Sequence, residues 1–507
     1  MILTDFLPTT VKEAQLRGWN EVDVVLFSGD AYIDHPAFAN AIVGRVIENQ
    51  GLRVAVVPQP DWRGDFRDFK KFGRPRLFFA VSGGNMDSMV NHYTANRRLR
   101  NDDAYTPDAR TGARPDRTTI IYCQILKKLF PDVPILIGGI EASMRRFTHY
   151  DYWDNELQQS ILVKSGADLG VYGMGEKPLS FIIKKLKNGK KFKEIKDVPQ
   201  TFYLIDKQEI ESQASNGSTV ELHSHKECLK DNRKQAENFR IIEENSNSLN
   251  GKTLIQQIEN KYIVVNQPFA PLTESELDAI YELPFAYLPH PKYRGKSIPA
   301  YEMIKHSVNI HRGCFGGCAF CTISAHQGKF ISSRSENSIL KEIKKIAQLP
   351  DFKGYLSDLG GPSANMYKMG GKNTEICEKC KKPSCIFPKT CRNLNSNLQP
   401  LIDLYKKVDA LAEVKKAFIG SGIRYDMLLD EKNENHEREY LAEVIKNHVS
   451  GRLKVAPEHT ADRVLSVMRK PSFSNFEKFK QMFDRINAQN HLNQQLIPYF
   501  ISSHPAC

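Results

Sequence analysis

Three cysteines within eight residues constrain this chain more than any other feature of its sequence. Cys314, Cys318 and Cys321 follow a C-x3-C-x2-C spacing in the run HRGCFGGCAFC, with glycines between the first two. A glycine-rich turn can bend the backbone until the three sulfurs converge on one small metal cluster. A closed structural zinc site or a fully ligated [4Fe–4S] cluster takes four protein ligands, so three ligands leave one metal position open to an exchangeable group.

The longer run HRGCFGGCAFCTISAHQGKFISSRS, residues 311–335, resembles the YgiQ-type group of the radical S-adenosylmethionine (SAM) superfamily. The resemblance implies that Cys314, Cys318 and Cys321 hold a [4Fe–4S] cluster whose fourth iron is chelated by the amino and carboxylate groups of SAM. It also implies that one electron from the reduced cluster breaks a C–S bond of SAM, and that the resulting 5′-deoxyadenosyl radical abstracts hydrogen from a substrate. A zinc loop or a chance grouping of cysteines is the alternative that the residues leave open.

The length of 507 residues predicts two or three domains. A content of 41% hydrophobic and 26% charged residues is typical of a soluble globular protein. The chain has no run of 18 apolar residues, and its N-terminus lacks the basic flank and apolar core of a signal peptide. We therefore expect a cytoplasmic location and no contact with a membrane.

The cysteines and the net charge narrow the expected chemistry and partners. Seven of the ten cysteines lie between residues 314 and 391, which favours metal ligation in a reducing compartment over disulfides. Cys123, in the apolar run TTIIYCQILKKLF, is expected to be a buried apolar side chain. The net charge of +12 permits nucleic acid or another anionic partner, although much of the excess falls on lysines of predicted helix surfaces.

Residues 1–195 predict a Rossmann-like α/β domain. Apolar runs predict strands at 23–27, 54–57, 77–81, 134–137 and 169–172, and helical spacing predicts helices at 38–50, 117–130 and 176–187. A doubly wound sheet of this kind binds ligands at the carboxyl ends of its strands. Glycines at several of these ends permit either close backbone approach to a ligand or simple tight turns: Gly29, Gly83, Gly84, Gly138, Gly139, Gly173 and Gly175.

This region resembles the cobalamin-binding-like domains that precede some radical SAM barrels, with Gly173-Met-Gly-Glu176 matching their G-x-G-E end. The D-x-H-x-x-G signature of a histidine ligand to cobalt is missing, because Asp34-His35-Pro36 has the wrong spacing and no following glycine. The resemblance therefore does not extend to cobalamin, which we do not expect. The irregular loop 96–117 carries six arginines, which suit either an anionic ligand or Arg–Asp pairs in a solvated loop.

Residues 196–299 predict a connector or insertion. The segment 205–260 is rich in Glu, Lys, Asn, Ser and Gln, and prolines interrupt the chain from residue 266 onward. From residue 300 the pattern changes to alternating strands and helices, with strands expected at 307–310, 354–358, 417–420, 452–455 and 496–501.

The resemblance implies that residues 300–507 form a partial (β/α)6 barrel of the TIM type, with the cysteine loop at the carboxyl end of its first strand. Helices are expected at 335–348, with Ser335 as its cap, and at 437–448. The chain stops soon after the last expected strand, so we expect a fragment that lacks the covering part of the barrel.

Two segments of this region resemble SAM-binding elements of the superfamily. Leu359-Gly-Gly-Pro362 resembles its Gly-Gly-Glu-like element, although proline replaces the acid, and 421–426 resembles its strand-four region. The resemblance implies SAM contacts from Gly360, Gly361, Ser421 and Arg424. Further polar candidates are Asp358, Asn365, Asp426, Glu458 and His459.

A second set of cysteines, Cys377, Cys380, Cys385 and Cys391, lies in an insertion at about 365–395. Four soft ligands within fifteen residues predict a second metal site. Zinc and a second iron–sulfur cluster both fit the spacing, and we favour zinc as a structural clamp. The lysines between these cysteines are the best local support for a nucleic-acid partner.

The sequence thus predicts a radical SAM enzyme of unknown substrate and unknown catalytic residues, supplied by an electron donor such as a flavodoxin or ferredoxin. A methylthiotransferase-like RNA-modifying enzyme is one alternative, favoured by the basic charge and the second cysteine set. A non-catalytic protein that binds zinc and nucleic acid is the other.

Overall fold

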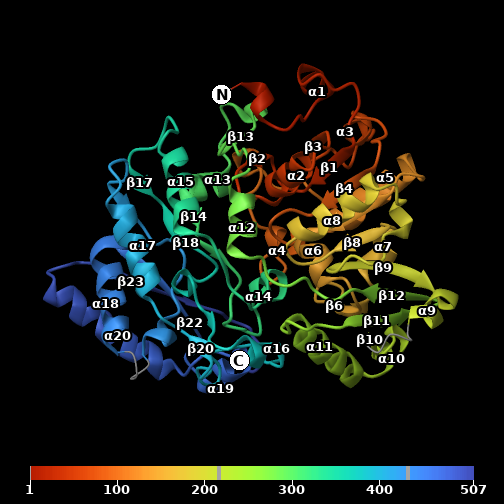
Figure 1. The fold of residues 1–507 in the computed structure, drawn as a ribbon. Helices are drawn as coiled ribbons and strands as arrows, with labels where there is room; N and C mark the ends of the chain where they lie inside the picture. Colours follow the sequence, from red (N-terminus) through yellow and green to blue (C-terminus); the bar gives the residue numbers. More distant parts are fainter. Residues whose placement is uncertain (1, 214–218, 430–433) are drawn as a thin grey trace. The chain divides into compact units, whose positions relative to one another are not determined.

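The computed structural model describes residues 2–213, 219–429 and 434–507, which form two compact units (Figure 1). The first unit consists of Met1–Ser246, Asn250–Ala270 and Leu283–Met303. The second consists of Asn247–Leu249, Pro271–Glu282 and Ile304–Cys507. None of the helices described combines the length and the apolar character that crossing a bilayer requires.

Among the described residues, a nine-stranded mixed sheet forms the core of the first unit. Its parallel part has the order β3-β1-β4-β5-β8, a doubly wound arrangement of the flavodoxin type. The strands are β1 (Val24–Ser28), β3 (Val54–Pro58), β4 (Phe78–Ser82), β5 (Ile135–Gly138) and β8 (Leu169–Val171). The helix α2 (Ala39–Asn49) lies between β1 and β3, and α5 (Thr118–Leu129) lies between β4 and β5. The helix α8 (Glu176–Lys187) follows β8.

These strands are almost wholly buried, as expected for parallel strands covered on both faces. Each of the strands and helices predicted for residues 1–195 is present within one residue of its expected bounds. Cys123 is buried in α5, as predicted.

The prediction of a connector over 196–299 is wrong. The strands β9 (Thr201–Asp206), β12 (Lys261–Val265), β11 (Thr253–Ile258) and β10 (Thr219–Leu222) continue the sheet beyond β8 in that order. The pairings from β8 to β11 are antiparallel. Each strand contributes buried apolar residues, and the charged helix α11 (Asn232–Ser246) between β10 and β11 lowers the average hydrophobicity of the segment. The average composition therefore concealed four strands whose buried residues, such as Phe202 and Ile263, complete the core.

The second unit alternates strands and helices. β14 (Ser307–Asn309) pairs in parallel with β18 (Asp358–Gly360), β17 (Tyr355–Leu356) with β21 (Lys416–Ala417), and β22 (Arg452–Glu458) with β23 (Gln495–Phe500). The intervening helices include α15 (Glu336–Ile346), α17 (Gln399–Asp409), α18 (Glu434–Glu443) with the π-helical turn η8 (Val444–His448), and α20 (Phe473–Gln489). Ser335 caps α15, as predicted, because its side chain accepts a hydrogen bond from the Ser338 N–H.

The strands of this unit are too short to form one continuous ladder. Among the described residues, the parallel strands of this unit fall at five places along the chain: β14, β17 with β18, β21, β22 and β23. A (β/α)6 barrel has six strands. Single backbone hydrogen bonds link residues next to these short strands. Leu359 N donates to Phe418 O, and Ile419 N donates to His448 O, both at 2.9 Å.

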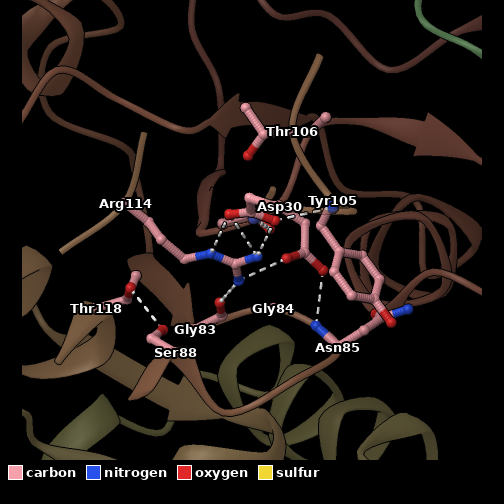
Figure 2. Close-up of polar contacts among 12 residues, drawn as sticks. Asp30, Gly83, Gly84, Asn85, Ser88, Tyr105, Thr106, Arg114 and Thr118 are labelled. Carbon is pink, nitrogen blue, oxygen red and sulfur yellow. Dashed lines mark hydrogen bonds and ion pairs between the residues drawn. The ribbon is translucent and has the colours of Figure 1, made fainter. Parts of the chain in front are cut away.

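The strand order of the first unit reverses between β1 and β4, the place where doubly wound folds bind ligands. In this protein, side chains fill that place (Figure 2). Arg114, from the arginine-rich loop, donates to Asp30 at 2.8 Å, to Asp103 at 3.2 Å and to the carbonyl of Gly83 at 2.9 Å. All three charged side chains are buried, so Arg114 belongs to an internal ion pair and not to a solvated loop.

The glycines at these strand ends make room for carboxylates. A Cβ on Gly83 would lie 2.5 Å from the Glu141 carboxylate, and one on Gly84 would overlap the carboxylate of Asp30. Glu141 accepts hydrogen bonds from the backbone of Ser88 at 3.1 Å and of Thr119 at 3.0 Å. At Gly83 and Gly84 the structure therefore shows a role that differs from both predicted ones, since the missing side chains make room for carboxylates of the protein itself.

Replacing Arg114 by leucine tests this network. Burial raises the pKa of Asp30 to about 6, and it also opposes the ionisation of Asp103, whose pKa Arg114 lowers. Arg114→Leu leaves two buried carboxylates without their cation, so we expect a loss of about 3–5 kcal/mol in the unfolding free energy of this unit. Urea unfolding monitored by circular dichroism measures it. Arg110→Leu, at an exposed arginine of the same loop, is the control, and equal stability of the two variants would contradict the role of Arg114.

Candidate active site and metal centre

A closed loop carries the three cysteines of the C-x3-C-x2-C motif. β15 (His311–Arg312) and β16 (Ser332–Ser333) pair antiparallel at its base. Within the loop, the N–H of Cys314 donates to Gly328 O and that of Cys321 to Cys318 O, both at 3.1 Å. The helix α14 (Thr322–Gln327) begins directly after Cys321, and all three cysteines are half-buried. The fold therefore holds the thiols on one short, internally bonded segment.

The surroundings of the thiols resist their ionisation unless positive charge compensates. Burial raises the pKa of Cys314, and the Arg424 guanidinium partly opposes this. Burial also raises the pKa of Cys321, which hydrogen bonds from the backbone N–H groups of Ile323 and Ser324 partly offset. Metals bind the thiolate form, so a nearby cation favours ligation.

Arg424 supplies such a cation. Its Nη1 lies 3.2 Å from Cys318 Sγ, and its Nε and Nη2 donate to Asp426 at 2.9 and 2.6 Å. The Asn365 side chain fixes the backbone of Arg424, accepting from its N–H at 2.8 Å and donating to its carbonyl at 3.0 Å. The structure thus brings Arg424, one of the residues expected to contact SAM, to the cysteines, and Asn365 and Asp426 position it.

Sequence reasoning missed a second buried cation, Lys470. Its Nζ lies 3.6 Å from Glu458 Oε1, and its side chain is 5% exposed. Burial and the like charge of Arg424 lower the pKa of Lys470, and burial raises the pKa of Glu458. Glu458 adopts φ +70°, a conformation that is rare for a residue with a side chain and recurs at functional sites. Lys470 follows α19 (Asp462–Met468) without any motif, so only the fold reveals it.

Protein groups already contact the other residues predicted to bind SAM. The Ser421 hydroxyl donates to Asp358 at 2.7 Å, and the Gly360 carbonyl accepts from the N–H of Ile310 at 2.9 Å. A Cβ on Gly361 would lie 2.5 Å from the imidazole of His311, which is buried. The bond between Ile310 and Gly360 joins the ends of β14 and β18. The bond between Ser421 and Asp358 joins β18 to the segment that follows β21. His459 makes a local turn, in which its Nδ1 accepts from the N–H of Ala461 at 2.9 Å.

The second cysteine set lies in a segment closed by the antiparallel pair β19 (Gly370–Gly371) and β20 (Leu394–Asn395). Within it, Cys391 N donates to Cys385 O at 2.8 Å and Cys380 N to Cys377 O at 3.1 Å. Burial raises the pKa of Cys385 to about 11; Lys329 opposes this rise, whereas the other three cysteines of the set add to it. The structure thus gathers the four cysteines, and Lys329 lies 3.8 Å from Cys380 Sγ.

The two cysteine segments pack directly against each other. Phe315 O, in the first loop, accepts from Cys385 N at 3.0 Å and from Ser384 Oγ at 3.3 Å. Gly317 adopts φ +61°, and a Cβ there would overlap the Pro383 carbonyl. A cavity of about 130 Å³ adjoins this contact, and its lining is Ile386, Phe387, Pro388, Lys389, Thr390, Asp426, Pro471 and Asn475.

Comparison with known protein families adds independent evidence. A family model described as "Radical SAM N-terminal" matches residues 6–307, more than half of the chain, and ends before Cys314. A UPF0313 protein of Bacteroides thetaiotaomicron is 61% identical over 520 residues, covering 100% of this chain and 83% of the relative. A UPF0313 protein of Porphyromonas gingivalis is 59% identical over 509 residues, covering 100% and 80%. One of Clostridium botulinum is 44% identical over 503 residues, covering 99% and 76%.

A solved structure of the radical SAM methyltransferase TsrM from Kitasatospora setae, with cobalamin and a [4Fe–4S] cluster bound, aligns with a TM-score of 0.47 and 13% identity. The alignment covers 94% of this chain and 68% of that one, and a likeness at this level carries no argument about function. The family model and the relatives aligned over the whole length of the chain show its family. The chain belongs to the radical SAM superfamily and, within it, to the UPF0313 group.

Proposed function

We propose that this protein is a radical SAM enzyme in which Cys314, Cys318 and Cys321 hold a [4Fe–4S] cluster with one iron open to SAM. The observation that carries the proposal is the placement of three half-buried thiols on one closed loop, with a buried guanidinium 3.2 Å from Cys318 Sγ. When bound, the cluster and SAM supply one-electron cleavage of a C–S bond and a 5′-deoxyadenosyl radical that abstracts hydrogen from a substrate. The proposal includes an electron donor of the flavodoxin or ferredoxin class and names no substrate.

The number of cysteines in the motif supports a cluster over a single structural zinc ion. A closed structural zinc site takes four protein ligands, whereas the three thiolates of this motif leave one metal position open.

The charged residues around the cysteines have complementary tasks in this proposal. Arg424 places a buried cation beside Cys318, and Lys470 is a second buried cation whose pKa the charge of Cys318 raises. Both positive charges would offset the negative charge of bound thiolates. Asp426 holds the guanidinium in place through two hydrogen bonds. Arg424, with Gly360, Gly361 and Ser421, would hold SAM, and Arg424 has the strongest support because it reaches the cysteines.

We further propose that Cys377, Cys380, Cys385 and Cys391 hold a second metal centre. The other three cysteines raise the pKa of Cys385 through their charge, and the segment donates two hydrogen bonds to Phe315 O in the first loop. The donor set accepts zinc or a second iron–sulfur cluster. By this packing, the second centre would support the backbone that carries the first.

The first prediction for this site concerns Cys314. After anaerobic reconstitution and reduction, the wild-type protein should form 5′-deoxyadenosine from SAM, and Cys314→Ala should lose this activity because the cluster lacks a ligand. Chromatography of the products and the visible absorbance of the cluster measure the two effects. Cys507→Ala, at an exposed cysteine, is the control and should behave as wild type. Wild-type protein that carries zinc alone and cleaves no SAM would instead indicate a non-catalytic zinc protein.

The second metal centre predicts a selective loss in Cys377→Ser. This variant should lose the second metal while the cluster at Cys314 remains detectable by its SAM-dependent change in electron paramagnetic resonance. Elemental analysis beside the Cys507→Ser control measures the loss. Loss of zinc would identify zinc as the second metal, loss of iron with acid-labile sulfide would identify a second cluster, and unchanged metal content would rule out the centre.

Gly317→Ala tests the packing between the two cysteine segments. The new Cβ would overlap the Pro383 carbonyl, and the φ of +61° adds strain of about 1–3 kcal/mol. We expect a lower melting temperature and less iron at both centres. Gly422→Ala is the matched control, because no atom lies within 4 Å of a Cβ at that position. Equal iron content in both variants would show that this contact does not support the clusters.

A further inference from the structure

Outside both cysteine sets, the second unit brings together a histidine and two carboxylates. Asp409 ends α17, Glu443 ends α18, and His448 ends the π-helical turn η8. Their ligand atoms all lie within 4.8 Å of one another. His448 Nε2 is 3.4 Å from Glu443 Oε1 and 3.8 Å from Asp409 Oδ2. Three helix ends therefore present one nitrogen and two oxygens to a common point.

The hydrogen bonding of His448 leaves its Nε2 available as a ligand. Nδ1 lies 2.8 Å from the carbonyl oxygen of Ala417, which can only accept, so Nδ1 carries the proton. In the neutral ring Nε2 then keeps its lone pair, and this buried atom has no hydrogen-bond partner among the described residues. Histidine ligands of metals commonly donate their other N–H to a backbone carbonyl in this way.

The distances suit ligands around one ion better than hydrogen bonds. Hydrogen bonds between nitrogen and oxygen span about 2.7–3.2 Å, shorter than either separation here. Ligands bonded at about 2.0–2.1 Å to a tetrahedral ion lie about 3.3–3.4 Å apart. Small side-chain movements would bring the carboxylates to that geometry. Asn447 already steadies one of them, since its Nδ2 donates to Glu443 Oε1 at 2.9 Å.

We propose that Asp409, Glu443 and His448 bind one divalent transition-metal ion of the Zn²⁺ or Mn²⁺ type, at a site separate from the cysteine centres. One imidazole and two carboxylates form a donor set that such ions accept, whereas thiolate sites prefer softer metals. The histidine is 1% exposed and the carboxylates of Glu443 and Asp409 are 17% and 34% exposed, so an ion can reach the site from solvent. The π-helical turn is consistent with this role, because such turns recur at functional sites.

The ion would fix the strand that leads to Arg424. His448 contacts that strand twice, through Nδ1 at Ala417 O and through its own carbonyl, which accepts from Ile419 N at 2.9 Å. Ser421 and Arg424 follow within five residues of Ile419. A bound ion would therefore hold the ends of α17 and η8 against β21 and its continuation, and the site is structural in this assignment.

Titration of the full-length protein with Mn²⁺ under anaerobic conditions tests the site. Electron paramagnetic resonance of free Mn²⁺ gives the amount bound, and Mn²⁺ is chosen because thiolates bind it weakly. We expect the wild-type protein to bind one equivalent and its melting temperature to rise. The double variant Asp409→Asn/Glu443→Gln should bind at least about tenfold more weakly, because both charged ligands are lost.

Glu439→Gln is the matched control, since Glu439 lies one turn away on α18 and pairs with Lys406 at 3.6 Å. It should retain wild-type binding. If the double variant does not fold, Asp409→Asn alone, at the most exposed ligand, serves in its place. No binding by wild type at millimolar Mn²⁺, or equal affinity in wild type and ligand variant, would overturn the proposal and leave an ordinary histidine–carboxylate pair.

Discussion

The contact between the Arg424 guanidinium and the Cys318 thiol is the interaction on which the second unit's proposed chemistry depends. The cysteines are half-buried, and burial raises the pKa of Cys314 and of Cys321. The Arg424 guanidinium, 3.2 Å from Cys318 Sγ, partly opposes the rise in the pKa of Cys314 and so favours the thiolate that a metal needs. Arg424 is in turn fixed at its side chain by Asp426 and at its backbone by Asn365, so its position is set by the fold and not by its own flexible stem.

The two cysteine segments of this region share one scaffold. Phe315, between the first two cysteines of the motif, accepts hydrogen bonds from the segment that carries Cys385. Gly317 permits a contact with the Pro383 carbonyl that no larger residue would allow. A substitution that disturbs this backbone contact should therefore affect both segments, because tightly packed backbone has little room to adjust.

The first unit has the fold of a ligand-binding sheet, but its own side chains fill the usual ligand site. Its strand order is that of a doubly wound sheet, yet the place between β1 and β4 where such sheets bind ligands holds the buried pairs of Arg114 with Asp30 and Asp103 (Figure 2). Glycines that commonly accompany a bound phosphate here accommodate the carboxylates of Glu141 and Asp30. A glycine after a strand thus indicates that some group comes close to the backbone there. Only the structure shows whether that group is a ligand or a side chain of the protein.

The sequence by itself determined the features that depend on neighbours along the chain. Apolar periodicity located the parallel strands and helices of residues 1–195, and the spacing of Cys314, Cys318 and Cys321 indicated a metal cluster, because both signals lie within short segments. Tertiary structure decided what depends on residues far apart: the four strands hidden in a charged segment, the burial of Arg114, the meeting of Arg424 with Cys318, and the grouping of Asp409, Glu443 and His448. Those arrangements arise from long-range packing, in which hydrogen bonds and charges join elements whose separation in sequence leaves no local pattern to read.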